Sequence, residues 1–228
     1  MIKNIYHKIT SYALEEKKLL SYIEKYVEHK EVLDVGCGYG RILQLLKSKK
    51  YNALGVEINP EIVDECNRMN LPCVTVDSFM KEYSSKKWDA IVMFHVIEHL
   101  ESDKCFEFID SYLDCLKPGG ILIIATPLLT EYFYEDFDHV KPYLPVGIQM
   151  VFGEQNAQVQ YRSRNKIELI DLWYKRYFYR VINQRFLYFP RSKLTMPIIN
   201  LFSALVFKMS FSVLGKKDGW LGVFRKCS

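Results

Sequence analysis

Hydrophobic positions along the chain fall into two patterns, and their alternation predicts an α/β protein. Short apolar runs predict buried strands over residues 32–35, 52–57, 73–76, 90–94 and 121–126. Between these runs, apolar residues recur at helical spacing and predict helices over 41–48, 61–69 and 102–116. Short apolar strands that alternate with helices specify a mostly parallel sheet with helices on both faces.

The flanking segments extend this core at both ends. Residues 3–28 have apolar residues at helical spacing, which predicts a helical N-terminal cap over 1–30. Beyond residue 127 the pattern predicts a loop, a helix, a long strand and a last short strand, over 137–145, 156–174, 177–189 and 219–226. The prediction is therefore one Rossmann-like domain over 31–228, built on a seven-stranded, mostly parallel sheet.

Charge divides this domain into two unequal parts. From residue 161 to the C-terminus there are 14 Lys and Arg against 3 Asp and Glu, whereas residues 1–160 carry a net negative charge. We expect an acidic cofactor-binding half over 31–127 and a basic, substrate-facing half over 128–228. Such asymmetry favours an anionic partner, and a solvated basic face is the alternative.

The spacing of the cysteines and the composition of residues 1–18 indicate the cellular compartment. The six cysteines form no CxxC pair, so we expect reduced thiols and neither a disulfide framework nor a metal site. Residues 1–18 are mixed and polar, unlike a secretory signal, and the expected location is the cytoplasm, with peripheral membrane contact as an option.

Three glycines follow the first predicted strand and mark the first candidate site. They run GxGxG in the stretch "VLDVGCGYG", where a bare main chain lets a ligand approach closely. Glu57 ends the second strand, where a carboxylate can accept hydrogen bonds from both ribose hydroxyls. Asp77 follows the third strand, where an acidic group can accept from an adenine amino group. Acidic groups around the turn repel phosphates and accommodate a cation, which disfavours a nicotinamide dinucleotide.

Four motifs in order resemble the class I S-adenosylmethionine-dependent methyltransferases: "VLDVGCGYG", "GVEINPE", "WDAIVMFHVIEHL" and "LKPGGILIIATP". The resemblance covers residues 31–127 and implies S-adenosylmethionine as cofactor and S-adenosylhomocysteine as product. It implies that the methionine end is held by Asp34, Gly36, Cys37, Gly38 and Gly40. It further implies that Glu57 binds the ribose, that His95 lies near the methyl group, and that the adenine contacts are Ile58, Asp77, Ser78 and Phe79.

Methyl transfer to a hydroxyl group needs a base, and histidine suits that role near neutral pH. His139, in the polar loop "EDFDHVKPY" with Asp138 to orient its ring, is the leading candidate. His95 is the second candidate, and His99 is the third. A divalent cation held by Glu98, His99 and Asp138 is conceivable, but no metal is expected.

The acceptor is the least determined part of the prediction. A looser resemblance to surface-glycan and quinone O-methyltransferases suggests a small molecule, a glycan or a lipid-linked precursor. The apolar segment 196–214 is interrupted by Pro197, Asn200 and Lys208, so it suits a lid or an interfacial element better than a membrane span. Two further functions remain open: an RNA methyltransferase, which only the basic third supports, and a non-catalytic binding module that retains the cofactor fold.

Overall fold

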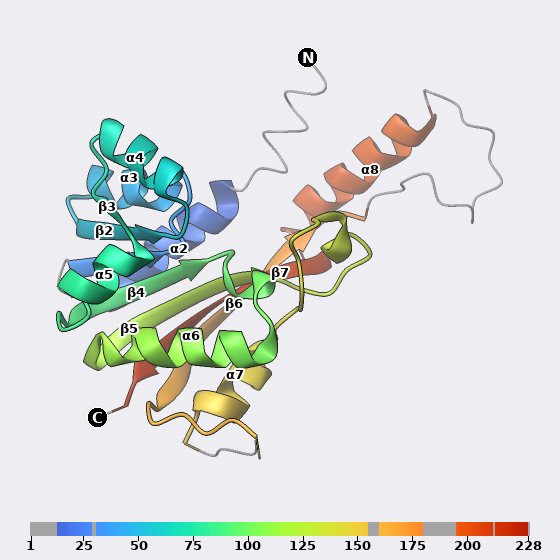
Figure 1. Ribbon diagram of the computed structural model, residues 1–228. Helices are drawn as coiled ribbons and strands as arrows, with labels where there is room; N and C mark the ends of the chain where they lie inside the picture. The colour runs from blue at the N-terminus through green and yellow to red at the C-terminus, as the bar shows by residue number, and fades with distance from the viewer. Residues whose placement is uncertain (1–12, 29–30, 155–159, 180–194, 212, 228) are drawn as a thin grey trace.

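A seven-stranded sheet forms the centre of this computed structural model, which describes residues 13–28, 31–154, 160–179, 195–211 and 213–227 (Figure 1). The strand order is β3-β2-β1-β4-β5-β7-β6, in which β1 to β5 are parallel and β7 runs antiparallel to both neighbours. The bounds are β1 Glu31–Val35, β2 Asn52–Glu57, β3 Cys73–Thr75, β4 Trp88–Phe94, β5 Leu116–Pro127, β6 Ile167–Tyr177 and β7 Lys216–Lys226. The mostly parallel seven-stranded prediction is confirmed.

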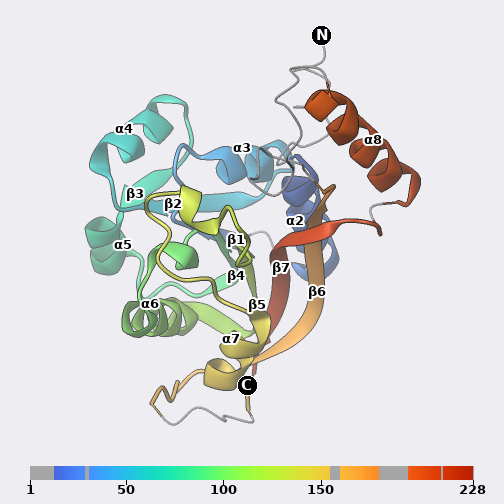
Figure 2. The same cartoon turned by 90° about the vertical axis from the view of Figure 1, so that its right-hand side faces the viewer.

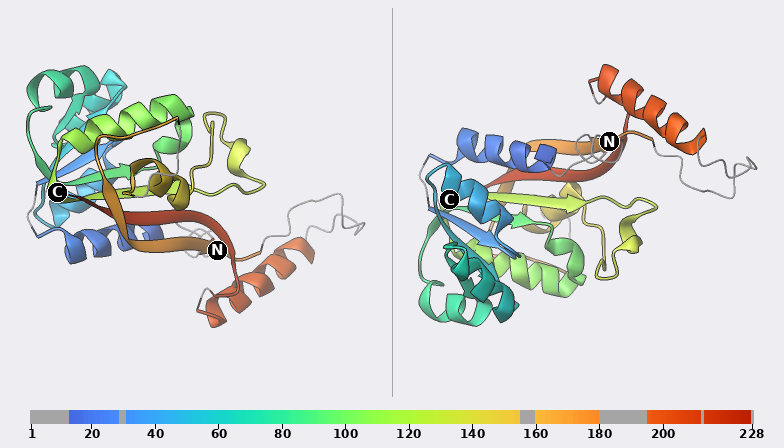
Figure 3. Two further views of the ribbon diagram at one scale, coloured as in Figure 1. Left: turned by 90° about the horizontal axis from the view of Figure 1, so that it is seen from below. Right: turned by 90° about the horizontal axis from the view of Figure 1, so that it is seen from above.

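Helices cover both faces of the sheet (Figures 2 and 3). One face carries α2 Ala13–Tyr26, α3 Arg41–Ser48 and α4 Pro60–Arg68. The other face carries α5 Val76–Glu82, α6 Ser102–Asp114 and α7 Pro145–Phe152. Two short 3-10 turns, η1 Ile97–His99 and η2 Phe133–Glu135, follow β4 and β5, and α8 Thr195–Met209 projects beyond the end of the sheet.

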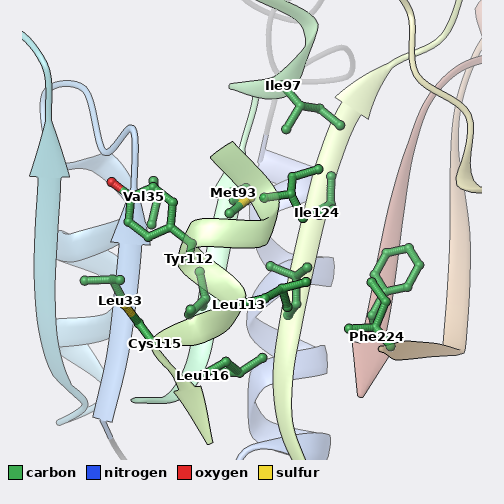
Figure 4. Packing of buried hydrophobic residues seen from close by; sticks show 14 of the residues in the cluster. Leu33, Val35, Met93, Ile97, Tyr112, Leu113, Cys115, Leu116, Ile124 and Phe224 are labelled. Atoms are coloured by element: carbon green, nitrogen blue, oxygen red, sulfur yellow. The ribbon is translucent and has the colours of Figure 1, made fainter. Parts of the chain in front are cut away.

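Packing on both faces explains why the strands are apolar throughout rather than alternating. Figure 4 shows Tyr112 and Leu113 of α6 against residues of β1, β4 and β5, among them Val35, Met93 and Ile124. On the opposite face, Leu19 and Ile23 of α2 pack in a second buried cluster with residues of the same strands. The core therefore lies in two layers, one on each side of the sheet.

One predicted element is wrong. Of the helix predicted over 156–174, residues 156–159 lie outside the described residues, and residues 160–174 form no helix because Ile167–Tyr177 is the edge strand β6. The pairing with β7 shifts between Leu169 and Asp171, which marks a bulge. The bulge places Ile170 and Asp171 on the same side, toward α2, and so breaks the two-residue period that announces a strand in a sequence. Of the strand predicted over 177–189, residues 180–189 lie outside the described residues.

Smaller differences concern the ends of elements. Val76 begins α5 instead of ending β3, and α7 occupies residues that the sequence pattern left unassigned. β5 already starts at Leu116, so the Lys-Pro-Gly-Gly segment is part of the strand. Within the N-terminal cap predicted over 1–30, the structure has helix α2, whereas residues 1–12 and 29–30 lie outside the described residues.

The carboxylate of Asp171 is one of the groups that attach α2 to the sheet. Asp171 of β6 accepts hydrogen bonds from the hydroxyl groups of Tyr22 at 2.9 Å and Tyr26 at 2.7 Å. Lys25 adds an ion pair at 3.1 Å. Burial opposes ionisation here, but the three donors outweigh it and lower the pKa of Asp171 to about 2.

Replacing this carboxylate should loosen α2. We expect Asp171→Asn to reduce the free energy of unfolding at pH 7 by about 2 kcal/mol, because the charge that strengthens these hydrogen bonds is lost. Since the pKa of Asp171 is lowered by folding, the difference should be complete above about pH 4 and fade as the pH falls toward 2. Urea unfolding checks this, with the exposed Glu168→Gln on the same strand as control; equal losses in both variants would contradict it.

Candidate active site

The glycine turn after β1 presents main chain where the sequence predicts a ligand. Gly36 and Gly38 have φ angles of +69° and +51°, in the left-handed region that glycine tolerates best. A Cβ atom on Gly36 would lie 2.5 Å from a methyl group of Val96, whereas one on Gly38 would meet nothing within 4 Å. Gly40 closes the turn as the N-cap of α3. The turn is therefore packed from behind and open at Gly38.

Glu57, at the end of β2, lies beside this turn. Its carboxylate accepts hydrogen bonds from the main-chain N–H groups of Gly38 at 3.0 Å, Ile58 at 2.9 Å and Asn59 at 3.1 Å. These three donors orient the carboxylate at the carboxyl edge of the sheet. Lone pairs remain on both oxygens, so the predicted contact with a diol is geometrically available.

Asp34 is the buried polar residue of β1, with only 1% of its surface exposed. Its Oδ2 atom has no hydrogen-bond partner in the described part of the chain. Burial, with the nearby charge of Glu57, raises the pKa of Asp34 to about 7. An unpaired buried carboxylate is costly, and a cationic group bound at this point would remove that cost.

The predicted adenine contacts separate into two groups. Ile58 is 82% exposed and Asp77 is exposed in the first turn of α5, with Ser78 partly exposed beside it. Phe79 was expected in the same group, but that expectation is wrong. Its ring is fully buried against Tyr112 and Tyr83, so it has no free face for a base.

Cys37 also differs from its prediction. Its N–H donates to the carbonyl of Val56, its own carbonyl accepts from Gly40, and its thiol points behind the turn toward Cys73 at 3.3 Å. Cys37 therefore shapes the turn, and its side chain is no cofactor contact.

Beyond β4, His95 lies between two buried carboxylates. Its Nδ1 atom is 3.0 Å from Oε1 of Glu98 and its Nε2 atom is 3.3 Å from Oε1 of Glu15. The other oxygens of these carboxylates bind Thr126 at 3.0 Å and Lys175 at 2.9 Å. No pattern in the sequence singles out Glu15, because nothing local distinguishes it from the adjacent Glu16.

This arrangement argues against His95 as a base. Burial lowers the pKa of His95, but Glu15 and Glu98 outweigh burial and raise it to about 9. The ring is therefore protonated near neutral pH and has no lone pair with which to take a proton. His95 also has a φ angle of +58°, a left-handed conformation that is uncommon for a residue other than glycine.

His139 and His99 lie side by side, with ring centres 5.1 Å apart. Nδ1 of His139 donates to the carbonyl of Phe133 at 2.7 Å, and Nδ1 of His99 donates to the carbonyl of Asp138 at 3.1 Å. Each contact leaves an Nε2 lone pair on a neutral ring. We expected the carboxylate of Asp138 to orient the His139 ring, and that expectation is wrong. The carboxylate near this ring is that of Asp136, whose Oδ2 atom lies 3.8 Å from Nε2 of His139.

The same histidines could also hold a cation. Glu98, His99 and His139 each offer a ligand atom, and these atoms lie within 4.8 Å of one another. The third ligand of this candidate cation site is therefore His139, where the sequence had suggested Asp138. Backbone carbonyls that fix the far nitrogen of each ring are typical second partners of metal-bound histidines.

Comparison with known proteins adds to this geometry. A family model described as "Methyltransferase domain" matches residues 6–194. The chain belongs to the methyltransferase domain family. A ubiquinone biosynthesis O-methyltransferase of Rickettsia akari is 27% identical over 135 residues, which cover 56% of this chain and 53% of the relative. A tRNA (carboxymethyluridine(34)-5-O)-methyltransferase of Arabidopsis thaliana is 24% identical, over 58% of this chain and 35% of the relative.

Solved structures agree on the fold. A SAM-dependent methyltransferase from Archaeoglobus fulgidus superposes with a TM-score of 0.62 at 22% identity and covers 97% of both chains. The chain spans about half the length of the curated relatives it matches first. The resemblance predicted from the motifs is confirmed, and the cofactor of this methyltransferase is S-adenosylmethionine.

The residues present fit that cofactor. The unpaired buried oxygen of Asp34 and the open Gly38 provide a place for a cationic methionine end, with Glu57 at hand for the ribose. Ile58 and Asp77 remain exposed at the same edge for the adenine. These assignments stay predictions that binding measurements test.

Cofactor affinity should therefore depend on pH through Asp34. Because the pKa of Asp34 is about 7 in the free protein, its charge is only complete above that value. We expect S-adenosylhomocysteine to bind more tightly at pH 8 than at pH 6 by a factor of about 10, since the bound ammonium group selects the carboxylate. Calorimetry of the intact chain at both pH values measures this. Asp34→Asn should bind weakly and without the pH dependence; an unchanged pH slope in that variant would refute the assignment.

Proposed function

We propose that this methyltransferase methylates a hydroxyl oxygen of a small molecule, a glycan or a lipid-linked precursor. The observation that carries the proposal is the hydrogen bond from Nδ1 of His139 to the carbonyl of Phe133, which leaves Nε2 as the proton acceptor of the ring. Such a nitrogen can take the proton of a hydroxyl group, a step that acceptors without an acidic proton do not need. Support also comes from the relatives named ubiquinone biosynthesis O-methyltransferase.

Each residue then has a limited task. The cofactor supplies a methyl group on a sulfonium, so the protein needs no covalent nucleophile. Asp34, Glu57 and the glycine turn bind and orient it, and the His95 imidazolium with its two carboxylates closes the site from the side of α2. Alignment of donor and acceptor is worth about 7 to 11 kcal/mol, and a positioned base adds about 10²- to 10⁴-fold.

A cavity of about 500 Å³ between the loop after β5 and the ends of β6 and β7 is the acceptor site that we propose. Its lining includes Lys175, which pairs with Glu15 and so connects the cavity to His95. Most of the other lining residues are aromatic or charged, among them Tyr132, Tyr177, Phe178, Glu131, Lys216 and Asp218. Aromatic walls with charges suit a flat or sugar ring that carries a polar or anionic group.

The proposal of a lipid-linked acceptor rests on helix α8. Ala204 and Phe207 pack this helix against Phe178, next to the cavity, whereas Phe202 is 68% and Met209 80% exposed. Among the described residues, α8 contributes none of the cavity lining. In this structure α8 therefore does not form a lid closed over the cavity. No described helix has both the length and the apolar character for a membrane span. We propose that the exposed side of α8, with Lys208, Lys216 and Lys217 close by in the chain, rests on an anionic membrane surface.

The sequence has four further basic residues between β6 and α8 that suit an anionic surface: Arg180, Arg185, Arg191 and Lys193. These four lie outside the described residues. Arg176 is described, and its guanidinium donates to the carbonyl of Val213, just after α8. The location at the cytoplasmic membrane surface remains a proposal.

The first test of the proposed function is to supply labelled S-adenosylmethionine and the purified chain to an extract of the source cells. We expect label in the lipid, polysaccharide or small-molecule fraction. Label in RNA would contradict the proposal and indicate an RNA acceptor, as the name of the tRNA methyltransferase relative suggests. Absence of label in every fraction, with intact binding of S-adenosylhomocysteine, would favour the non-catalytic module.

His139 can be tested once an acceptor is known. We expect His139→Ala to lower kcat by about 10²- to 10⁴-fold at neutral pH while S-adenosylhomocysteine still binds, because only the proton acceptor is lost. Asp138→Ala is the matched control, since this exposed carboxylate contacts neither histidine ring in the described part of the chain and the main-chain carbonyl of Asp138 remains for His99. Turnover of His139→Ala close to that of the unaltered chain would make the assignment wrong.

A chelator separates the two uses of His139. If the imidazole acts as base, turnover survives dialysis against EDTA. If Glu98, His99 and His139 hold a divalent cation that binds the acceptor oxygen, EDTA abolishes turnover and Mg²⁺ or Mn²⁺ restores it.

A further inference from the structure

Three of the six cysteines meet behind the glycine turn, although they are far apart in the sequence. Cys37 belongs to the turn after β1, Cys66 to α4 and Cys73 to the start of β3. The three Sγ atoms lie within 4.8 Å of one another, and those of Cys37 and Cys73 are 3.3 Å apart. All three side chains are buried.

The spacing of the sulfurs suits a single ion. Sulfur atoms bound to Zn²⁺ at about 2.3 Å lie about 4 Å from one another, close to the distances found here. Soft thiolates from three separate elements are the ligands that thiophilic d¹⁰ ions such as Cu⁺, Zn²⁺ and Cd²⁺ prefer. The three sulfurs therefore need only small movements to surround an ion.

The surroundings leave room for sulfur in particular. A Cβ atom on Gly55 would lie 2.7 Å from Sγ of Cys37, and one on Gly40 would lie 3.2 Å from Sγ of Cys66. Apolar side chains close the rest of the cluster against water: Leu43, Val63 and Leu71. The hydrogen bond between Cys37 and Cys73 raises the pKa of the Cys37 thiol and lowers that of Cys73, while burial raises the pKa of Cys66 to about 11. The charge of the ion must therefore displace the protons of Cys37 and Cys66.

The carbonyl of Gly38 connects the thiols with the cofactor site. Its oxygen is 3.3 Å from Sγ of Cys66 and 3.6 Å from Sγ of Cys37, next to two of the three sulfurs. The N–H of the same residue donates to Glu57 on the other side of the turn. An ion between the sulfurs would therefore act on the segment that also contacts the cofactor.

We propose that Cys37, Cys66 and Cys73 form a binding site for one thiophilic d¹⁰ metal ion behind the cofactor turn. Binding converts three thiols into three thiolates and releases three protons, with no change of oxidation state. The site is separate from the proposed acceptor chemistry, and it holds whether or not a hydroxyl group is the acceptor. Because ion and cofactor share the Gly38 turn, each changes the affinity for the other by the same factor.

Cd²⁺ titration of the reduced, full-length chain tests the site. Thiolate-to-cadmium charge transfer absorbs in the ultraviolet, so the bound ions and their ligands can be counted directly. We expect one Cd²⁺ per chain and a higher thermal transition in its presence, since the ion binds the folded state. Cys66→Ser and Cys73→Ala should weaken binding by more than about 100-fold, because each loses a direct ligand rather than an outer partner.

Cys227→Ser is the matched control, since this partly exposed thiol lies outside the cluster and is the obvious adventitious ligand. It should bind Cd²⁺ as the unaltered chain does. Far-ultraviolet circular dichroism and S-adenosylhomocysteine binding show that the variants are folded. The proposal is overturned if the unaltered chain shows no charge-transfer band, if a folded Cys66→Ser keeps it, or if Cys227→Ser loses it.

Discussion

The carboxylate of Glu98 holds the site together. This carboxylate is completely buried; one oxygen faces His95, and the other accepts a hydrogen bond from the hydroxyl group of Thr126. The main-chain carbonyl of Glu98 accepts hydrogen bonds from the N–H groups of Val140 and Lys141. The ends of β4 and β5 and the loop that carries His139 therefore meet at one residue. A buried charge is tolerated only when it is paired and fully hydrogen-bonded, so this contact allows little freedom to the segments around it.

A line of ion pairs with alternating charge extends from Glu98 across the molecule. Glu98 is followed by His95, Glu15, Lys175 and Asp218, which come from four different parts of the chain. The line joins α2, the turn after β4 and the two antiparallel strands, and it ends in the cavity that we propose for the acceptor. The N-terminal helix is thus part of the site, because removing Glu15 would leave His95 and Lys175 as half-buried cations with one partner fewer.

Parallel strand order explains why these groups converge at all. The carboxyl ends of β1, β2, β3 and β4 lie at one edge of the sheet, so the residues that follow each strand become neighbours in space. The cofactor residues occupy one half of that edge. The histidines and the cavity occupy the other half, beyond β4, where the loops after β5 and the antiparallel pair extend the sheet.

The sequence by itself determined the parallel core, the glycine turn, Asp34 and Glu57, because each depends on local chemistry: apolar runs for strands buried on both faces, and positive φ angles that favour glycine. Only the tertiary structure decided which groups touch. It buried Phe79 under α6, it aligned His139 with Phe133 rather than Asp138, and it brought Glu15 to His95 and three thiols together. These contacts join residues far apart in the chain, and no local pattern records them. The β6 bulge is the intermediate case, since one extra residue in the pairing removed the period that would have shown the strand.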